Sequence, residues 1–140
     1  MKGYLLDTNV ISELTKDSPD PEVMKFIFEQ KDSFWLSPVV LHELEFGLQL
    51  LPEGKRRHGL DKLLAEFIIE YEKRILPLDR QEAELAARLR SQARRSGRVL
   101  HLGDALIAGT AKTHCLSVAT RNTEDFAGLD VKVTNPWETQ

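Results

Sequence analysis

The stretch "YLLDTNVISEL", residues 4–14, changes abruptly from apolar to polar character. Three aromatic or apolar residues, 4–6, precede Asp7, Thr8 and Asn9, and an apolar pattern then resumes. This order predicts a short buried strand followed directly by a helix. Asp7 has two interpretations, because Asp side chains cap helices well, whereas ligands of open α/β sheets bind at the carboxyl ends of strands. The stretch alone leaves both interpretations open.

Short β-branched or aromatic runs alternate with longer amphipathic ones along the chain, which is typical of βαβ units around a parallel sheet. Helix starts are readable at Asp20-Pro21, Ser37-Pro38 and Asp79, and another Ala-rich helix begins at Gly103-Asp104. Gly97 suits the end of the helix that Asp79 opens. We expect a single α/β domain over residues 1–140, with a central, mainly parallel sheet of about five strands at 4–6, 34–36, 74–76, 116–119 and 131–133.

Composition excludes several classes of protein. The 140 residues are 41% hydrophobic and 29% charged, without an apolar run near the roughly 20 residues of a membrane span. We therefore expect a soluble, cytoplasmic protein with no membrane association. The single cysteine, Cys115, excludes an internal disulfide, and its apolar neighbours predict a buried thiol. The net charge of −3 means that any nucleic-acid binding must be local.

Glu43 interrupts an apolar row of its helix. Val39, Glu43, Phe46 and Leu50 follow i, i+4, i+7, i+11 spacing, which predicts that the carboxylate lies on the apolar face. Buried carboxylates are rare unless they are paired or bind a metal ion. The alternative is that Glu43 lies at the edge of the row and pairs with a Lys or Arg.

Two further acidic segments repeat this pattern. Asp104 shares a helical row with small or apolar residues, although a first-turn Asp could simply favour the helix dipole. The segment "SVATRNTEDF" leaves an apolar run in the same way as the first strand does, with Asn122 and Asp125 after it. Convergence of these groups explains their placement better than coincidence. Clustered carboxylates are stable in ionised form only when cations neutralise them.

The donor set favours Mg²⁺ or Mn²⁺, because oxygen ligands select hard cations. His42, His58, His101 and His114 have no zinc-site spacing, and we interpret them as surface or packing residues. An acidic Mg²⁺ site without a catalytic triad is best suited to phosphoryl transfer, because metal ions can activate water and stabilise the leaving oxygen.

Five segments together resemble one family. They are "LLDTNVISEL", "SPVVLHELEFGL", "LHLGDALIAGTA", "ATRNTEDF" and the closing "NPW". Over nearly its whole length the chain resembles the PIN-domain ribonucleases, and closely the VapC or FitB-like toxins of type II toxin–antitoxin pairs. The match departs from the family at Gly109, where members usually have Ala.

The resemblance implies a three-layer α/β/α fold and a Mg²⁺- or Mn²⁺-dependent endoribonuclease that leaves a 3′-hydroxyl and a 5′-phosphate. It carries Asp7, Glu43 and Asp104 over as catalytic metal ligands, with Asp125 as the fourth. Thr8 and Asn122 would be polar supports. A haloacid-dehalogenase-like phosphatase is disfavoured, because that class needs a second Asp where this chain has Asn9.

The resemblance also implies partners: a cognate antitoxin, an RNA substrate such as tRNA or mRNA, operator DNA only through the antitoxin, and a homodimer or toxin–antitoxin hetero-oligomer. An alternative is an antitoxin-binding subunit of an operator-DNA complex with weak or no nuclease activity. Arg90, Arg94 and Arg98 recur at i, i+4 spacing and are candidates for RNA binding, although a solvated helix face explains them as well.

Overall fold

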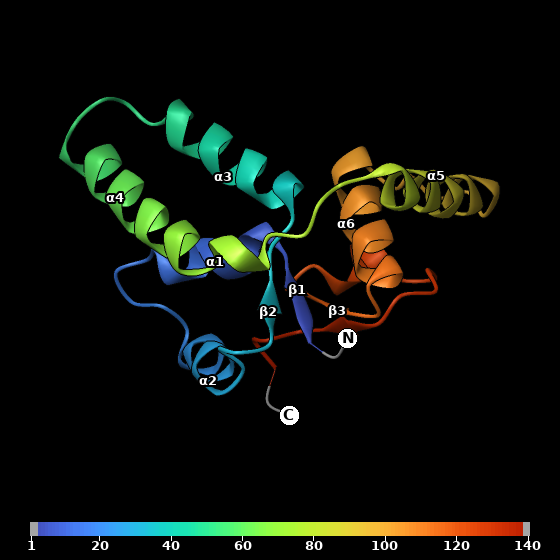
Figure 1. Cartoon of the computed structure of the whole chain (residues 1–140), viewed down its shortest axis with the longest axis horizontal. Helices are drawn as coiled ribbons and strands as arrows, with labels where there is room; N and C mark the ends of the chain where they lie inside the picture. Colours follow the sequence, from blue (N-terminus) through green and yellow to red (C-terminus); the bar gives the residue numbers. More distant parts are fainter. Residues whose placement is uncertain (1–2, 139–140) are drawn as a thin grey trace.

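A four-stranded parallel sheet forms the centre of the protein. The computed structural model describes residues 3–138, so both ends of the expected 1–140 domain lie outside the described residues. The strands lie in the order β2-β1-β3-β4, and each neighbouring pair is parallel. They are β1 (Tyr4–Leu6), β2 (Phe34–Trp35), β3 (Ser117–Ala119) and β4 (Val133–Thr134). The expected α/β class and the parallel arrangement are confirmed (Figure 1).

The sheet has four strands rather than the expected five. The segment 74–76 forms a single parallel bridge, Leu36 to Ile75, beside β2. Two backbone hydrogen bonds of 2.9 Å hold it, from Leu36 N to Arg74 O and from Leu76 N to Leu36 O. The preceding residues form a short 3-10 helix, η1 (Glu72–Arg74). Because Arg74 ends that helix, too few extended residues remain for a fifth strand.

Within residues 3–138 six α-helices connect the strands, and the expected helix starts at Asp20, Ser37 and Asp79 are confirmed. The helix expected to begin at Gly103-Asp104 begins slightly earlier, at Leu102 after His101. The Asp20 carboxylate accepts a 2.8 Å hydrogen bond from Glu22 N, and the Ser37 hydroxyl accepts one of 3.1 Å from Val39 N. Such side-chain acceptors satisfy amides that have no partner within the helix. The helices are α1 (Thr8–Leu14), α2 (Pro21–Glu29), α3 (Pro38–Leu50), α4 (Lys55–Glu70), α5 (Arg80–Arg95) and α6 (Leu102–Thr113). None within residues 3–138 is long and apolar enough to cross a membrane.

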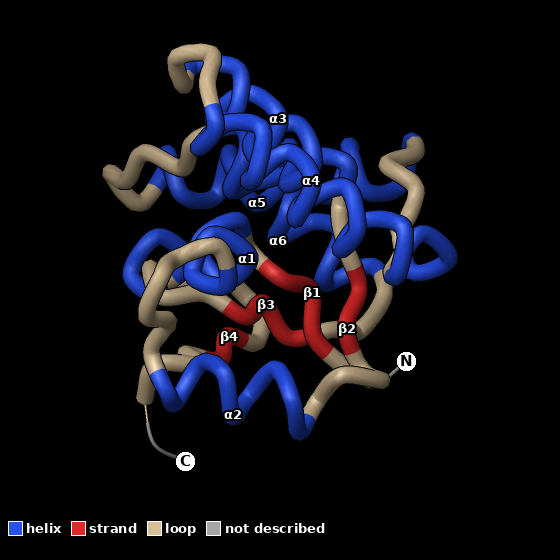
Figure 2. The backbone as a smooth tube through the Cα atoms, turned by 90° about the vertical axis from the view of Figure 1, so that its left-hand side faces the viewer, coloured by secondary structure: helices blue, strands red, loops and turns tan. Residues whose placement is uncertain are grey.

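Helices cover the sheet on two sides. Figure 1 shows α5 and α6 on one side of the strands and α2 on the other, and the turned view in Figure 2 shows α2 away from α3 and α4. Leu5, Leu6 and Val118 of the sheet are fully buried, together with Ile107 and Ala108 of α6. This arrangement has the three layers that the resemblance implies. The small side chains of α6 allow that helix to lie close to the sheet.

Gly109 marks a close contact between α5 and α6. A Cβ atom at this position would lie 2.8 Å from the carbonyl oxygen of Glu82 and 2.9 Å from the amide nitrogen of Ala86. Both are backbone atoms, which cannot move aside as a flexible side chain would. Glycine at this position therefore matches the short distance between the two helix backbones.

Cys115 differs from its expected burial, because its residue is exposed. The residue lies in the turn after α6 with a φ of +57°, the left-handed region that non-glycine residues seldom adopt. The buried residue of this segment is its neighbour Leu116, which leads into β3. The apolar neighbours of Cys115 therefore belong to the buried strand that follows, and they do not indicate that the thiol is buried.

Candidate active site

Asp7 lies at the carboxyl end of β1 and is only 7% exposed. Its Oδ1 accepts a 2.8 Å hydrogen bond from Thr8 N at the start of α1, so Asp7 does cap this helix. Its Oδ2 accepts a 2.7 Å hydrogen bond from the hydroxyl of Thr120, which follows β3. One carboxylate oxygen therefore caps α1 while the other connects the ends of two strands, so the two interpretations of Asp7 are compatible.

Thr120 and Asn9 organise this edge of the sheet, and neither was among the expected site residues. The fully buried Thr120 hydroxyl accepts hydrogen bonds from Asn122 N (3.0 Å) and from Asn9 Nδ2 (3.2 Å). Asn9 Oδ1 in turn accepts one from Arg121 N (3.2 Å). The available signal in the sequence was the similar exit of both strands into Thr and Asn residues. The two hydrogen bonds of Asn9, to Thr120 and from Arg121, join residues more than 110 positions apart.

A cleft of about 370 Å³ opens above these strand ends. Its walls include three of the four expected acids, Asp7, Glu43 and Asp104, together with both expected supports, Thr8 and Asn122. The acids come from the end of β1, the middle of α3 and the first turn of α6, respectively. The structure thus brings together side chains from three distant parts of the sequence.

The charges of the cleft act most strongly on Asp104. The pKa of Asp104 is raised from 3.8 to about 6. The main cause is burial of this carboxyl, followed by the charges of Asp7, Asp125 and Glu43, whereas His101 acts in the opposite direction. Asp125 lies in the 3-10 helix η2 (Thr123–Phe126) and is exposed. It is not part of the cleft wall, but it is close enough for its charge to act on Asp104.

Glu43 reaches the cleft from a helix face that was wrongly expected to be buried. The buried residues of α3 are Val40, Leu44 and Leu48, whereas Phe46 and Leu50, on the row of Glu43, are 58% and 69% exposed. A Cβ atom at Gly103 would lie 3.9 Å from Glu43 Oε1, so this carboxylate lies beside the start of α6.

The pKa of Glu43 is also raised. Partial desolvation is the main cause and the charge of Asp7 the second, while the Thr8 hydroxyl and His42 act in the opposite direction. Removing a cluster of acids from water disfavours their charged forms. A bound cation would lower this pKa and oppose the effect of both causes, since its charge would stabilise the carboxylates.

The polar atoms of the cleft suit a hard cation. Its acids offer carboxylate oxygens, the ligands that Mg²⁺ and Mn²⁺ prefer. Thr8 Oγ1 is buried and has no hydrogen bond of acceptable geometry among the described residues, although it lies near enough to Glu43 to lower the pKa of that carboxyl. Across residues 3–138, no three Asp, Glu, His or Cys side chains already have the arrangement of a metal site. Binding an ion would therefore require the carboxylates to draw closer together.

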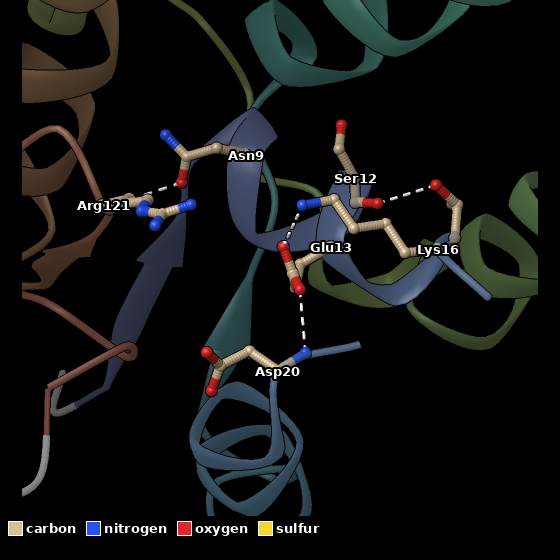
Figure 3. A network of polar contacts seen from close by, with 7 residues as sticks. Asn9, Ser12, Glu13, Lys16, Asp20 and Arg121 are labelled. Carbon is tan, nitrogen blue, oxygen red and sulfur yellow. Dashed lines mark hydrogen bonds and ion pairs between the residues drawn. The ribbon is translucent and has the colours of Figure 1, made fainter. Parts of the chain in front are cut away.

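The lining of the cleft also carries positive charge, from Lys16 and Arg121, which Figure 3 shows near Glu13 and Asn9. Lys16 Nζ lies 2.8 Å from Glu13 Oε1, and Glu13 Oε2 accepts a 2.8 Å hydrogen bond from Asp20 N. The hydrogen bonds from Lys16 and from the Asp20 backbone lower the pKa of Glu13. Glu13 is therefore an ion-paired carboxylate that fastens α1 to the start of α2. Its ion pair with a lysine distinguishes it from Asp7, Glu43 and Asp104, none of which has such a pair among the described residues.

The three arginines expected to bind RNA line a different groove. Arg90, Arg94 and Arg98 border a space of about 690 Å³ formed by residues of α5 and α6 and the segment between them. The Arg98 guanidinium donates a 2.9 Å hydrogen bond to the carbonyl oxygen of Glu124. Arg121, which the sequence did not single out, is the arginine of the acidic cleft.

Known proteins resemble this chain over almost its whole length. It is 41% identical to VapC ribonuclease Y4jK of Sinorhizobium fredii over 136 residues, which cover 96% of this chain and 97% of the relative. It is 40% identical to Toxin FitB of Neisseria gonorrhoeae over 135 residues, covering 95% and 97%.

A solved structure shares the fold as well. The structure of FitAB bound to an IR36 DNA fragment contains a chain that matches with a TM-score of 0.91 and 37% identity, covering 98% of this chain and 97% of that one. The family model described as PIN domain matches residues 4–132. This match covers β1, β2 and β3 and all four expected acids, and it ends just before β4. The chain therefore belongs to the PIN domain family.

Proposed function

We propose that this protein is a metal-dependent endoribonuclease that acts as the toxin of a type II toxin–antitoxin pair. The observation that carries the proposal is the convergence of Asp7, Glu43 and Asp104 in one cleft, where mutual repulsion and burial raise the pKa of Asp104 to about 6. Such a site favours a cation over an empty, fully ionised state. The names of the relatives, a VapC ribonuclease and a FitB toxin, support the same conclusion.

Asp7, Glu43 and Asp104 would hold Mg²⁺ or Mn²⁺, and Asp125 would complete the set of four acids. PIN-domain ribonucleases generally depend on divalent metal ions. When bound, such an ion supplies Lewis acidity toward phosphoryl oxygens and toward the attacking water. The charge of Asp125 acts on Asp104 and helps to raise the pKa of that carboxyl, which supports a place for Asp125 beside the site.

The remaining groups of the cleft would orient these carboxylates. The Thr120 hydroxyl and Thr8 N bind one oxygen each of Asp7, so the direction of this carboxylate is set before any ligand arrives. The start of α6 lies beside Glu43 Oε1, and the positive end of a helix dipole favours a carboxylate there. Fixed donors of this kind lower the reorganisation that a reaction requires.

The proposed partners are an RNA substrate and a cognate antitoxin that inhibits cleavage. The FitAB complex on DNA supports a toxin–antitoxin assembly that reaches operator DNA through its antitoxin. Exposed apolar side chains such as Phe28, Phe46 and Ile69 are compatible with a protein partner or a second copy. An RNA substrate such as tRNA or mRNA would place this activity in the cytoplasm.

The deciding experiment is cleavage of total bacterial RNA, tRNA included, by antitoxin-free protein with Mg²⁺ or Mn²⁺. EDTA and Asp104→Asn should each abolish discrete products, because both remove the cation or one of its ligands. Asp32→Asn is the matched control, since this exposed Asp lies in the loop between α2 and β2. It should cleave as the unsubstituted chain does.

A folded, metal-binding protein that yields no products would favour the alternative, an antitoxin-binding subunit of an operator-DNA complex. Isothermal titration with Mn²⁺ tests the proposed metal ligands independently of cleavage, because it measures metal binding without RNA. Loss of Mn²⁺ binding in Asp104→Asn but not in Asp32→Asn is the expected result. Equal binding by both variants would contradict the assignment of Asp104.

A further inference from the structure

Arg121 and Trp137 form a cationic and aromatic pair within the acidic cleft. The Arg121 guanidinium carbon lies 5.3 Å from the centroid of the Trp137 ring, and both residues line the same space as Asp7 and Asp104. Arg121 follows β3 by two residues, and Trp137 follows β4 by three. The pair therefore lies at the same carboxyl edge of the sheet as the acids.

Asparagine side chains fix the backbone of both residues. Asn9 Oδ1 accepts a 3.2 Å hydrogen bond from Arg121 N, and Asn135 Oδ1 accepts one of 2.9 Å from Trp137 N. Asn9 also binds Thr120, whose hydroxyl donates to Asp7. The position of Arg121 is thus tied to the carboxylate at the centre of the site, and Figure 3 shows Arg121 beside Asn9.

The two cationic side chains that line the cleft, Lys16 and Arg121, differ in their surroundings. Lys16 forms an ion pair with the buried Glu13, whereas the guanidinium of Arg121 lies over the Trp137 ring. A cation–π contact does not use the N–H donors of a guanidinium as an ion pair does, and these donors match phosphate oxygens. Arg121 is therefore better suited than Lys16 to bind an anion that enters the cleft.

An RNA strand in the cleft needs positive charge and an aromatic surface beside the acids. The phosphate to be cleaved can lie against the acids only with a cation between them, because Asp7, Glu43 and Asp104 repel it. The neighbouring phosphate requires positive charge from the protein itself. Aromatic side chains stack on unpaired bases irrespective of sequence, and Trp137 places such a ring next to the guanidinium.

We propose that Arg121 and Trp137 bind the nucleotide next to the cleaved phosphodiester bond, with Arg121 donating to its phosphate and the partly buried Trp137 stacking on its base through the part of the ring that lines the cleft. This inference rests on the proposed ribonuclease function. It assigns single-stranded RNA, or an unpaired nucleotide of a folded RNA, to this wall of the cleft.

The test measures RNA binding apart from cleavage. The probe is a fluorescein-labelled, twelve-nucleotide single-stranded RNA of mixed sequence, titrated in EDTA against Asp104→Asn protein, which lacks one of the repelling carboxylates and should not cut the RNA. Adding Arg121→Gln should weaken binding about 5-fold or more and should reduce the dependence of log K on log salt by about 0.7, the value for one phosphate contact on a single strand. Arg80→Gln is the matched control, because Arg80 pairs with Glu84 on the surface of α5, outside the cleft. It should change neither quantity.

Trp137 has its own readout. The chain contains two tryptophans, so Trp35→Phe leaves Trp137 as the only one, and base stacking should quench its fluorescence as the RNA binds. Trp137→Leu should weaken binding about 5- to 100-fold, the range for the loss of one stacked base. RNA that binds without quenching, or an unchanged affinity and salt dependence in Arg121→Gln, would overturn the inference. Absence of measurable RNA binding by Asp104→Asn protein that keeps Arg121 and Trp137 would overturn it too.

Failure of this inference is distinguishable from failure of the proposed function. If the unsubstituted chain cleaves RNA with Mg²⁺ and Arg121→Gln has the same kcat/KM, affinity and salt dependence, the function stands and the inference is wrong. If the folded chain cleaves nothing but binds the oligonucleotide through Arg121, the cleft binds RNA and the nuclease assignment is wrong.

Discussion

The Thr120 hydroxyl donates a 2.7 Å hydrogen bond to Asp7 Oδ2, although 113 residues separate the two in sequence. Thr120 follows β3 and Asp7 follows β1, the two central strands of the sheet. The chain leaves β1 toward β2 on one side and leaves β3 toward β4 on the other. Such a reversal of direction is where open parallel sheets bind ligands, so this hydrogen bond fixes a carboxylate at that point.

Replacing Thr120 with Val should remove this donor while keeping the shape of the side chain. A buried carboxylate that loses a hydrogen bond costs about 1 to 3 kcal/mol, so urea unfolding should show a lower free energy of unfolding by that amount. RNA cleavage should fall as well, because Asp7 would be free to turn. Thr120→Ser keeps the hydroxyl and should retain most of the activity. A Val variant with unchanged stability and activity would contradict the role of this contact.

Asp104→Asn should stabilise the metal-free protein at neutral pH while abolishing cleavage. The pKa of Asp104 is raised from 3.8 to about 6, which corresponds to at most about 3 kcal/mol. Solvent screening at this half-buried carboxyl reduces the expected gain to about 1 to 2 kcal/mol. The gain reflects relief from burying one more charge among Asp7, Glu43 and Asp125.

The pH dependence of that gain has a definite sign. Between pH 3.8 and about 6 the folded protein binds more protons at Asp104 than the unfolded chain does, so stability falls as the pH rises through this window. The difference between Asp104→Asn and the unsubstituted chain should thus be full above pH 6 and absent below pH 3.8. Urea unfolding in EDTA over this pH range measures it. A difference that grows toward low pH would refute the raised pKa.

Glu13→Gln should show the opposite dependence on pH. Hydrogen bonds from Lys16 and from the Asp20 backbone lower the pKa of Glu13 from 4.5, so its contribution to stability is present above pH 4.5 and is lost as the pH falls through the lowered value. Thermal unfolding should show a reduced Tm for the variant at pH 7 and little difference at about pH 2. Glu53→Gln, at an exposed loop position, is the control and should leave Tm unchanged at both pH values.

Local signals predicted the starts of three helices and the end of one correctly. Asp20, Ser37 and Asp79 each precede an observed helix, because a capping side chain acts on amides only two or three residues away. Gly97 ends α5 with a φ of +78°, as expected of a left-handed helix end. The fifth strand was overpredicted, because residues 74–76 are apolar enough for a strand but the preceding 3-10 helix limits them to one bridge.

Glu43 illustrates where periodicity fails. Two apolar rows lie side by side on α3, one through Val40 and Leu44 and the other through Phe46 and Leu50. Spacing alone does not say which row faces the core, and the row of Glu43 is the exposed one. The residue reaches the cleft because α3 passes the start of α6, which is a tertiary relationship. The same holds for Thr120, whose partner lies at the far end of the chain.

Gly109→Ala and Gly47→Ala offer a matched pair of substitutions in helix interiors. A methyl group at Gly109 would lie 2.8 Å from Glu82 O and 2.9 Å from Ala86 N, both backbone atoms of α5, whereas one at Gly47 would have nothing within 4 Å. Helix propensity alone favours Ala over Gly by about 1 kcal/mol at either site. The clash at Gly109 should outweigh that preference, because separating two packed helices costs about 1 to 3 kcal/mol or more.

We therefore expect urea unfolding to show a destabilised Gly109→Ala protein and a slightly stabilised Gly47→Ala protein. RNA cleavage should fall in the first, since Asp104 lies on the helix that must move, and should persist in the second. A Gly109→Ala protein as stable as the unsubstituted chain would mean that α5 and α6 separate easily. The glycine at this position would then be unrelated to their close contact, and an alanine would fit equally well.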